Sequence, residues 1–561
     1  MIRHVSPISG IDAYDDRWVA TAGYDNQVIL WESRTKTALA RGYHDHLANQ
    51  CRFSPCGRFL ITASSDHSAR IWEVPTMRLL AVLAEHDDDV EMAVPCPVSR
   101  RVATASRDCR VRIFDFAGRC ELTFEGHEAD VISVEWIRGG RELVSSSDDG
   151  TVRRWDAIAG GAIEIVDLGS IESDTVVASP DGFLFVGNDE GEIVSIGPGH
   201  ESRVKAHEAG IKRLLFHSER RELVSTGYDR CVQIWRASDH GDLARTHMAD
   251  VPPQVWLRAG CFVSPTTLAF GTFGSSYATY DVTRATWDLS GVEDTPGVNA
   301  VLAFDGGRIT TGDAGFVHRS GRIQSNPGSL CNFLTPWLDG VLTGGQTGQL
   351  FDALTGRVLY QHRSPLNCAV EIPRDDERQA IVGTYTGEGL VFARREGNIE
   401  LVDVVPMHGN AIKGIACNGP RIFSVDATGA AALHRTGDLT LEQRVPKGHL
   451  RISNGADSLP DGRFVSVSRD RKLRIWDGLG PTIVETPHTH SIKCVCAGRR
   501  LVATGSYSGT VCLYHLEKRA WVHQERPTCA GISSLARGEE PDTFLASSYD
   551  GNVYEIRGAG R

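Results

Sequence analysis

The stretch that decides the fold reads GHEADVISVEW (126–136), RELVSSS (141–147), DDG (148–150) and TVRRWD (151–156). It contains three runs rich in β-branched and apolar residues, and short polar segments separate them. The polar turn stands six residues before Trp155. This pattern indicates three short strands joined by tight turns, with an aromatic side chain near the end of the last one.

The same unit recurs along the chain about every forty residues, which is the mark of a repeat architecture. Clear copies cover His44–Trp72, His207–Trp235 and His449–Asp477. The closing aromatic, or its substitute in weaker copies, forms two series of seven: Trp31, Trp72, Phe114, Trp155, Ile196, Trp235 and Tyr280, then about His318, Phe351, Phe392, His434, Trp476, Tyr514 and Ile556. The sequence therefore predicts fourteen units, of which those between about 295 and 437 are the least regular.

These features resemble the WD-repeat (WD40) family over nearly the whole chain. The opening Gly-His, the Ser/Thr-x-x-x-Asp of the second strand and turn, and the closing Trp-Asp carry the resemblance. It implies an all-β fold of two tandem seven-bladed β-propellers with four-stranded antiparallel blades. The expected boundaries are 1–290 and 291–561, with one terminal strand exchanged at the ring closures.

The resemblance also implies a buried polar set in each regular blade. A buried carboxylate needs hydrogen-bond donors, and imidazole, hydroxyl and indole N–H groups supply them. The third unit keeps His86, Thr104 and Asp108, with Phe114 in the Trp position. The full structural sets are His44, Thr62, Asp66, Trp72; His127, Ser145, Asp149, Trp155; His207, Ser225, Asp229, Trp235; and His449, Ser466, Asp470, Trp476.

Ring closure leaves two alternatives open, because an unpaired sheet edge invites aggregation. Two segments could serve as spare strands, IRHVS (2–6) and ATWDLS (285–290). In the first arrangement, 285–290 completes blade seven and the N-terminal segment completes blade fourteen. In the second, which we prefer, the N-terminal segment completes blade seven and 285–290 completes blade fourteen.

Composition narrows the classes of function. The 561 residues include 59 Lys+Arg against 71 Asp+Glu, a net charge of −12, which argues against a phosphate-tracking nucleic-acid surface. No apolar run reaches the length of a membrane span, and MIRHVSPISG is not an export signal. The 14 cysteines contain no CxxC pair, so we expect reduced thiols and a cytoplasmic location.

Motifs for catalysis, cofactors or metals are not expected. GSYSG (505–509) has Tyr507 where a hydrolase elbow needs serine, and there is no phosphate-binding GxxxxGK[ST] loop. Cys494 and Cys496 are assigned to the core. The pairs His44-x-His46 and His488-x-His490 and the run 87–89 are assigned to structural or solvated positions rather than to a metal site.

The most informative residues precede the turn acid, where the second strand reaches one face of the ring. In the first ring these are Tyr24, Ser65, Arg107, Asp148, Asp189, Tyr228 and Phe273. Closure would bring Tyr228, Phe273 and Tyr24 into one exposed aromatic arc, and exposed aromatics and arginines favour binding hot spots. The predicted partner-binding residues are Tyr24, Arg107, Tyr228, Phe273, Tyr385, Arg469, Tyr507 and Tyr549.

The resemblance implies a cytoplasmic, non-enzymatic scaffold that holds partner proteins on its faces, without cofactor or membrane contact. The alternative is an enzyme, or an essential non-catalytic subunit of an enzyme complex, that uses the central funnel or the cleft between the propellers. Clustered carboxylates and histidines of perturbed pKa in the funnel would favour that alternative. An RNA-associated subunit would need a basic stripe that the net charge does not indicate.

Overall fold

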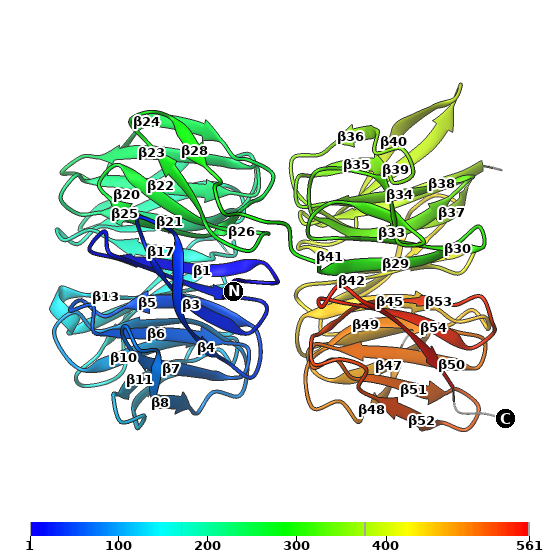
Figure 1. Ribbon diagram of the computed structural model, residues 1–561, viewed down its shortest axis with the longest axis horizontal. Coiled ribbons are helices and arrows are strands. Elements are labelled where there is room, and N and C mark those ends of the chain that lie inside the picture. The colour runs from blue at the N-terminus through cyan, green and yellow to red at the C-terminus, as the bar shows by residue number, and fades with distance from the viewer. Residues whose placement is uncertain (1, 170, 375–376, 479, 559–561) are drawn as a thin grey trace. The chain divides into compact units, whose positions relative to one another are not determined.

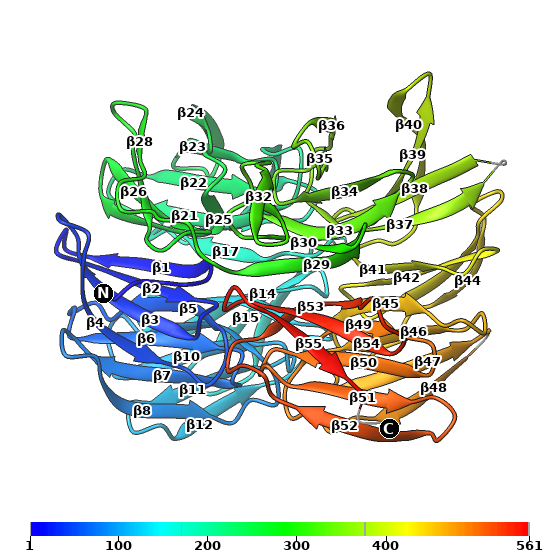
Figure 2. The ribbon, with the colours of Figure 1, turned by 45° about the vertical axis from the view of Figure 1, so that its right-hand side comes forward.

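A computed structural model describes residues 2–169, 171–374, 377–478 and 480–558, and it divides into two compact units, Met1–Thr295 and Pro296–Arg561. Within the described residues, the regular structure is β-strand apart from one 3₁₀ turn at Arg138–Gly140. The strands form thirteen antiparallel four-stranded sheets and one three-stranded sheet among these residues. The all-β fold of two tandem seven-bladed propellers is confirmed (Figures 1 and 2).

Each blade of the first propeller is built from consecutive strands. The blades are β1–β4 (Ile8–Tyr14, Trp18–Gly23, Gln27–Glu32, Thr37–Tyr43), β5–β8 (Ala48–Phe53, Phe59–Ser64, Ser68–Glu73, Arg78–Ala84), β9–β12 (Val90–Pro95, Arg101–Ser106, Val111–Asp115, Cys120–Phe124), β13–β16 (Val131–Ile137, Glu142–Ser147, Thr151–Asp156, Ala162–Asp167), β17–β20 (Thr175–Ala178, Leu184–Gly187, Glu192–Gly197, His200–Lys205), β21–β24 (Ile211–His217, Glu222–Gly227, Cys231–Ala237, Leu243–Asp250) and β25–β28 (Val255–Ser264, Thr267–Thr272, Ala278–Asp281, Thr286–Asp288).

The second propeller follows the same plan. Its blades are β29–β32 (Val298–Phe304, Gly307–Gly312, Val317–Arg319, Arg322–Ser325), β33–β36 (Cys331–Trp337, Gly340–Gly345, Gln349–Asp352, Val358–Gln361), β37–β40 (Leu366–Arg374, Glu377–Thr384, Glu388–Arg395, Asn398–Pro406), β41–β44 (Ile412–Cys417, Arg421–Asp426, Ala431–Arg435, Leu441–Val445), β45–β48 (Ser453–Ser458, Phe464–Ser468, Lys472–Asp477, Gly480–Glu485), β49–β52 (Ile492–Ala497, Leu501–Ser506, Val511–His515, Ala520–Glu525) and β53–β55 (Ile532–Arg537, Thr543–Ser548, Val553–Arg557).

Strand composition explains the order of strands within a blade. Second strands such as β6, FLITAS, are rich in small residues and almost wholly buried, because neighbouring blades cover both of their faces. Fourth strands such as β4, TALARGY, alternate exposed and half-buried side chains, as expected for an outer edge. The exposed side chains of β4 are Thr37, Leu39, Arg41 and Tyr43, so this outer edge carries both polar and apolar groups.

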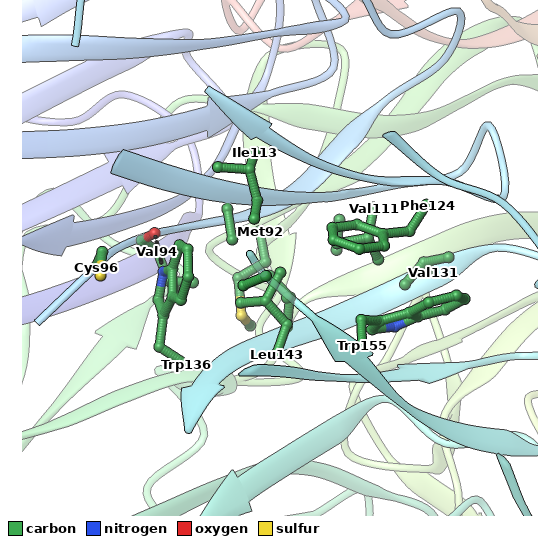
Figure 3. Packing of buried hydrophobic residues seen from close by; sticks show 14 residues of the cluster. Met92, Val94, Cys96, Val111, Ile113, Phe124, Val131, Trp136, Leu143 and Trp155 are labelled. Atoms are coloured by element: carbon green, nitrogen blue, oxygen red, sulfur yellow. Dashed lines mark hydrogen bonds between the residues drawn. The ribbon is translucent and has the colours of Figure 1, made fainter. Parts of the chain in front are cut away.

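The core of each propeller lies between blades rather than inside one sheet. Figure 3 shows one cluster, in which Met92 and Val94 of β9 pack against Trp136 of β13 and Leu143 of β14. The indole N–H of Trp136 donates to the carbonyl of Val94 at 3.0 Å, so the one polar atom of this large side chain is paired. Burial of each such aromatic contributes about 1.5–3 kcal/mol, and this holds adjacent blades together.

The first propeller closes through its innermost strands and its N-terminal segment. Strand β1 lies against β25 as well as against β5. Ile11 and Trp31 of blade one share a buried cluster with Cys261 and Tyr277 of blade seven. The backbone N–H of His4 donates to the carbonyl of Ser275 at 3.0 Å, which ties the start of the chain to the last blade of the ring.

The preferred assignment of the spare strands was wrong. Residues Thr286–Asp288 of ATWDLS form β28, the fourth strand of their own blade, because Trp287 packs on Tyr280 and Phe270 at 4.8 and 5.3 Å. The segment IRHVS is not a strand in the described residues. Blade fourteen has three strands among them, so the expected strand exchange has no counterpart in this part of the chain.

The second propeller is joined by a repeated side-chain contact that we call the stitch. The second residue of an innermost strand donates to the backbone carbonyl that begins the innermost strand of the next blade. Asn299, Asn332, Asn367 and Asn454 do so to Cys331, Leu366, Ile412 and Ile492 at 3.2, 2.9, 2.8 and 2.7 Å. Ser533 donates to Val298 and thereby closes the ring. Lys413 and Lys493 occupy the same position in the two remaining blades.

Candidate functional site

The structural sets expected from the repeats are joined by hydrogen bonds. In blade four, His127 Nδ1 lies 2.8 Å from Asp149, His127 Nε2 lies 2.8 Å from Ser145 Oγ, and the Trp155 indole N–H donates to that hydroxyl at 2.9 Å. Burial raises the pKa of Asp149, but hydrogen bonds from His127 and Thr151 outweigh it and hold this pKa well below its ordinary value. The same contacts join the sets that begin at His44, His207 and His449.

In blade three, His86 reaches Asp108 at 2.9 Å and Thr104 at 2.7 Å, while Phe114 is fully buried in the Trp position. These five sets lock the turn between the second and third strands. They therefore act on stability and leave the side chain just before each turn acid available for other roles.

The sequence interpretation missed a set in blade one. His4 Nδ1 lies 3.0 Å from Asp25, His4 Nε2 lies 2.8 Å from Thr21 Oγ1, and the Trp31 indole N–H donates to Thr21 at 2.7 Å. The signal was present, because His4 precedes Thr21 by 17 residues and His44 precedes Thr62 by 18. It was overlooked because His4 lies in the segment that was assigned to an exchanged strand.

A second missed set lies in the irregular part of the chain. His408 Nδ1 is 3.0 Å from Asp426 and His408 Nε2 is 2.8 Å from Ser424. The carboxylate stands at the end of β42 rather than in the following turn, so it has moved two residues toward the serine. A search for Ser/Thr-x-x-x-Asp cannot detect this arrangement.

Blade thirteen keeps only part of the set. His488 Nε2 bonds Thr504 Oγ1 at 2.8 Å, but Ser508 stands where other blades have aspartate. Burial, with a smaller contribution from His490, lowers the pKa of His488 to about 4. His488 is therefore a neutral imidazole, and among the described residues the only hydrogen-bond contact of its Nδ1 is the Cys512 sulfur at 4.0 Å.

Ser508→Asp is expected to restore this set and to stabilise the second propeller by about 1 kcal/mol, the usual net value of a buried hydrogen bond. The new carboxylate should also raise the pKa of His488, because an adjacent negative charge favours imidazolium. Thermal unfolding and NMR titration of His488 would measure both effects. Ser508→Asn is the neutral control, and an equal gain from asparagine would contradict the charge-based explanation.

The side chains just before the turns form a ring on one face of each propeller. In every blade, the backbone N–H of this residue donates to a carbonyl in the loop just before its own innermost strand, as Tyr24 does to Pro7 at 2.9 Å and Tyr549 does to Gly531 at 3.1 Å. We call this residue the rim position and the face that carries it the entrance face. The rim positions not assigned from sequence are Asp313, Gln346 and Ala427.

The predicted aromatic arc of the first propeller needs a correction. Phe273 is only 4% exposed, because Trp256 covers it in a stacked contact at 5.5 Å. Trp256 also meets Tyr24 edge to face at 5.2 Å, and both rings are partly exposed. Trp256 is the second residue of β25, and an innermost strand directs its second residue toward the entrance, a placement that is visible only once the strand register is known.

Tyr228 belongs to a charged part of the same entrance. Lys212 Nζ lies 4.5 Å from the Tyr228 ring centroid, and it pairs with Asp189 at 2.7 Å and with Asp174. Burial, together with Glu172 and other nearby carboxylates, raises the pKa of Asp148 well above its ordinary value.

Two arginines form ion pairs with acidic residues in the rest of this entrance. Arg107 pairs with Glu91 and Asp130, and Arg258 bonds Glu91 at 2.6 Å and the Tyr24 hydroxyl at 3.2 Å. Arg107 is thus a partly buried member of the network rather than an exposed side chain. The entrance of the first propeller therefore combines partly exposed aromatics with paired charges.

The other motifs singled out in the sequence occupy ordinary positions. Cys494 and Cys496 are buried in one apolar cluster. His67, Asp88 and Asp89 come within 4.8 Å of one another, but Asp89 accepts a hydrogen bond from Ser65 at 2.9 Å, and Asp88 accepts one from the Asp89 backbone at 2.9 Å. These hydrogen bonds give the two carboxylates a structural role.

Comparison with known proteins agrees with this geometry. The WD40 family (WD domain, G-beta repeat) matches residues 39–73, 77–115, 118–156, 199–236, 442–477 and 481–515. The chain belongs to the WD40 family. Each match runs from the fourth strand of one blade, or the turn before it, to the third strand of the next, as 118–156 does from β12 to β15. Successive WD40 repeats therefore interlock neighbouring blades.

Relatives of this WD40 protein match only parts of it. The guanine nucleotide-binding protein subunit beta of Oryza sativa subsp. indica is 27% identical over 225 residues, 35% of this chain and 58% of the relative. Nuclear distribution protein PAC1 of Arthroderma benhamiae is 29% identical over 163 residues, 25% and 35% of the two chains. WD repeat-containing protein 37 of Mus musculus is 35% identical over 103 residues, 18% and 21%. The matches thus cover less than two thirds of each relative's length.

Among the described residues of this WD40 protein, no helix has the length and apolar character needed to span a bilayer.

Proposed function

We propose that this WD40 protein is a non-catalytic scaffold that holds partner proteins on the entrance faces of its propellers. The observation that carries the proposal is the rim position, where one backbone hydrogen bond is kept in every blade while the side chain varies. A rigid frame that presents varied side chains gives specificity without a large cost in ordering entropy. The WD40 relatives support an interaction role in general. The cytoplasmic location expected from the thiols remains part of this proposal.

The entrance of the first propeller is the principal surface in this proposal. Tyr24, Trp256 and Tyr228 supply partly exposed aromatic area, and such side chains dominate binding energy when a partner buries them. Phe273 supports Trp256 from below, and Arg107 positions the neighbouring carboxylates. At the second propeller, Tyr385, Arg469, Tyr507 and Tyr549 are the corresponding rim residues.

The loops between blades on this face favour a basic partner for the first propeller. They contain a single basic residue, Arg3, in the segment before β1. Their acidic residues are Asp45, Glu85, Asp87, Asp88, Asp89, Glu125, Glu128, Asp130, Glu172, Asp174 and Glu208. A face of one charge steers an oppositely charged partner and raises its rate of association.

The triple variant Tyr24→Ala, Trp256→Ala, Tyr228→Ala is expected to abolish capture of the native partner in affinity purification from the host. Each truncated hot-spot aromatic typically costs about 2 kcal/mol or more of binding energy. The melting temperature should change little, because all three side chains are partly exposed. Mass spectrometry of the captured material would identify the partner and measure the loss.

A matched control removes exposed apolar side chains from the outer strands. Leu39, Leu80 and Ile165 are 43%, 40% and 54% exposed, so their replacement by alanine tests whether any loss of surface hydrophobicity suffices. Full capture by the aromatic triple variant would contradict the choice of the first entrance as principal surface. Equal loss in both variants would mean that capture is not specific to the entrance.

The acidic funnel is the observation that favours the second candidate, an enzyme or a non-catalytic subunit of one. Asp148, with its raised pKa, lies near Asp130, Glu172 and Asp174. We favour the scaffold because two of these carboxylates are held in ion pairs, Asp130 by Arg107 and Asp174 by Lys212. Asp148→Asn should leave partner capture unchanged, whereas loss of a measured activity in the purified complex with capture intact would favour the second candidate.

A further inference from the structure

We propose that the entrance of the second propeller is a binding site for an acidic peptide segment, whose anionic side chains bind Lys413 and Lys493. This inference rests on the proposed scaffold function and deepens it by naming the chemistry of one partner. It is carried by the placement of the two lysines, by their lack of carboxylate partners and by the charge of the surrounding loops.

Both lysines occupy the position that elsewhere makes the stitch. They are the second residues of β41 and β49, where five other blades of this propeller use Asn or Ser to bond the next blade. A lysine here gives up a structural hydrogen bond and places an ammonium group at the entrance. The two lysines therefore supply positive charge at positions where asparagine would join neighbouring blades.

Tyrosine rings, rather than carboxylates, face these ammonium groups. Lys413 Nζ lies 4.1 Å from the Tyr385 ring centroid, and Lys493 Nζ lies 5.9 Å from that of Tyr507. Burial raises the pKa of Tyr385, but Lys413 and Lys493 together outweigh it and lower this pKa below its ordinary value. Both lysines thus act on one phenol, which places their charges in a common region.

Lys212 of the first propeller provides an internal comparison, because it occupies the same strand position. It is neutralised by Asp174 and Asp189. Across the described part of the chain, by contrast, no carboxylate forms an ion pair with Lys413 or Lys493. A partly desolvated cation without a counter-ion is costly, and an anionic ligand would relieve that cost.

The loops between blades extend this positive region. On the entrance face of the second propeller, the segments 326–330, 362–365, 407–411, 446–452, 486–491 and 526–531 contain no Asp or Glu. Their basic residues are Arg363, Lys447, Arg451 and Arg526. The six loops between consecutive blades of the first propeller together contain acidic residues and no Lys or Arg, so the two entrances select ligands of opposite sign.

A peptide fits these observations better than a nucleic acid. Lys413 and Lys493 lie on innermost strands at the entrance. They do not form a continuous line of basic side chains that could follow a phosphate backbone. The chain as a whole carries a net charge of −12, which repels a long polyanion. Carboxylates or phosphate groups on a short segment can enter the funnel, while tyrosines contact the aliphatic parts of the segment.

The test measures fluorescence anisotropy of a fluorescein-labelled hexaglutamate peptide with the full-length chain. We expect saturable binding that weakens as ionic strength rises, because screening shortens the range of the charges. The double variant Lys413→Asn, Lys493→Asn should lose affinity about tenfold or more. Asparagine is the residue that the fold uses at this position, so the variant should melt at or above the wild-type temperature.

The matched control is Arg499→Asn, Lys518→Asn, which removes two exposed charges from turns on the opposite face of the same propeller. It should bind hexaglutamate as the wild type does. The charge-conserving variant Lys413→Arg, Lys493→Arg should also retain binding, and it keeps the test decisive if the asparagine variant does not fold.

Four outcomes would overturn the inference: no binding of hexaglutamate at low salt, equal affinity in the asparagine variant, tighter lysine-dependent binding of an oligouridine probe, or dissociation of a self-associated chain by the peptide. The last would show that the acidic face of a second copy occupies the site. The triple variant of the first entrance should still bind hexaglutamate, so failure of partner capture there remains distinguishable from failure here.

Discussion

Asp149→Ala is expected to destabilise the first propeller by about 1–3 kcal/mol or more. The carboxylate accepts hydrogen bonds from His127 at 2.8 Å, from the Glu128 backbone at 3.0 Å, and from the Thr151 backbone and hydroxyl at 2.9 and 2.7 Å. Alanine would leave all of these donors without a partner in a largely buried site. Differential scanning calorimetry should show the loss in the transition of the first propeller, and Asp229→Ala should behave in the same way.

The control for this prediction is Glu164→Ala in the same blade. Glu164 is an exposed acid that pairs with Arg154 at 2.6 Å on an outer strand, and exposed pairs contribute about 0–1 kcal/mol. A loss below a few tenths of a kcal/mol for Asp149→Ala, or a loss equal to that of the control, would show that the polar set does not stabilise the turn.

Removal of residues 2–6 is also expected to destabilise the first propeller. His4 and Ser6 are each 1% exposed, and the segment bonds blade one through Asp25 and blade seven through Ser275. Its loss would remove the histidine of one polar set and the link across the closing point of the ring. We expect a drop in melting temperature of about 4 °C or more, the shift that about 2 kcal/mol causes in a domain of this size.

Arg3→Ala is the matched control for the deletion. The Arg3 side chain is 52% exposed and pairs with an exposed Glu293, so its loss should change the melting temperature little. His4→Ala alone should reproduce a large part of the deletion effect. An unchanged melting temperature in the deletion variant would contradict the assignment of this segment to ring closure.

The repeat signature was sufficient to predict the number of blades and five of the polar sets, because each blade needs the same donors for the same buried carboxylate. It failed at ring closure, since the choice between spare strands depends on where Trp287 and His4 pack, and both contacts join distant parts of the chain. Trp256 was missed and Phe273 was expected to be exposed, because strand register decides which aromatic covers the other. The opposite charges of the two entrances were readable in the sequence only after the fold showed which loops share a face.

The position of His4 has a consequence for biosynthesis. Residues 2–6 leave the ribosome well before their contact on blade seven, Ser275, which is synthesised almost a whole propeller later. Until then the innermost strand of blade one has an open flank, where β25 lies in the finished ring. The nascent chain therefore exposes this strand edge until β25 has been synthesised, so any protection of the edge would act during translation rather than after release.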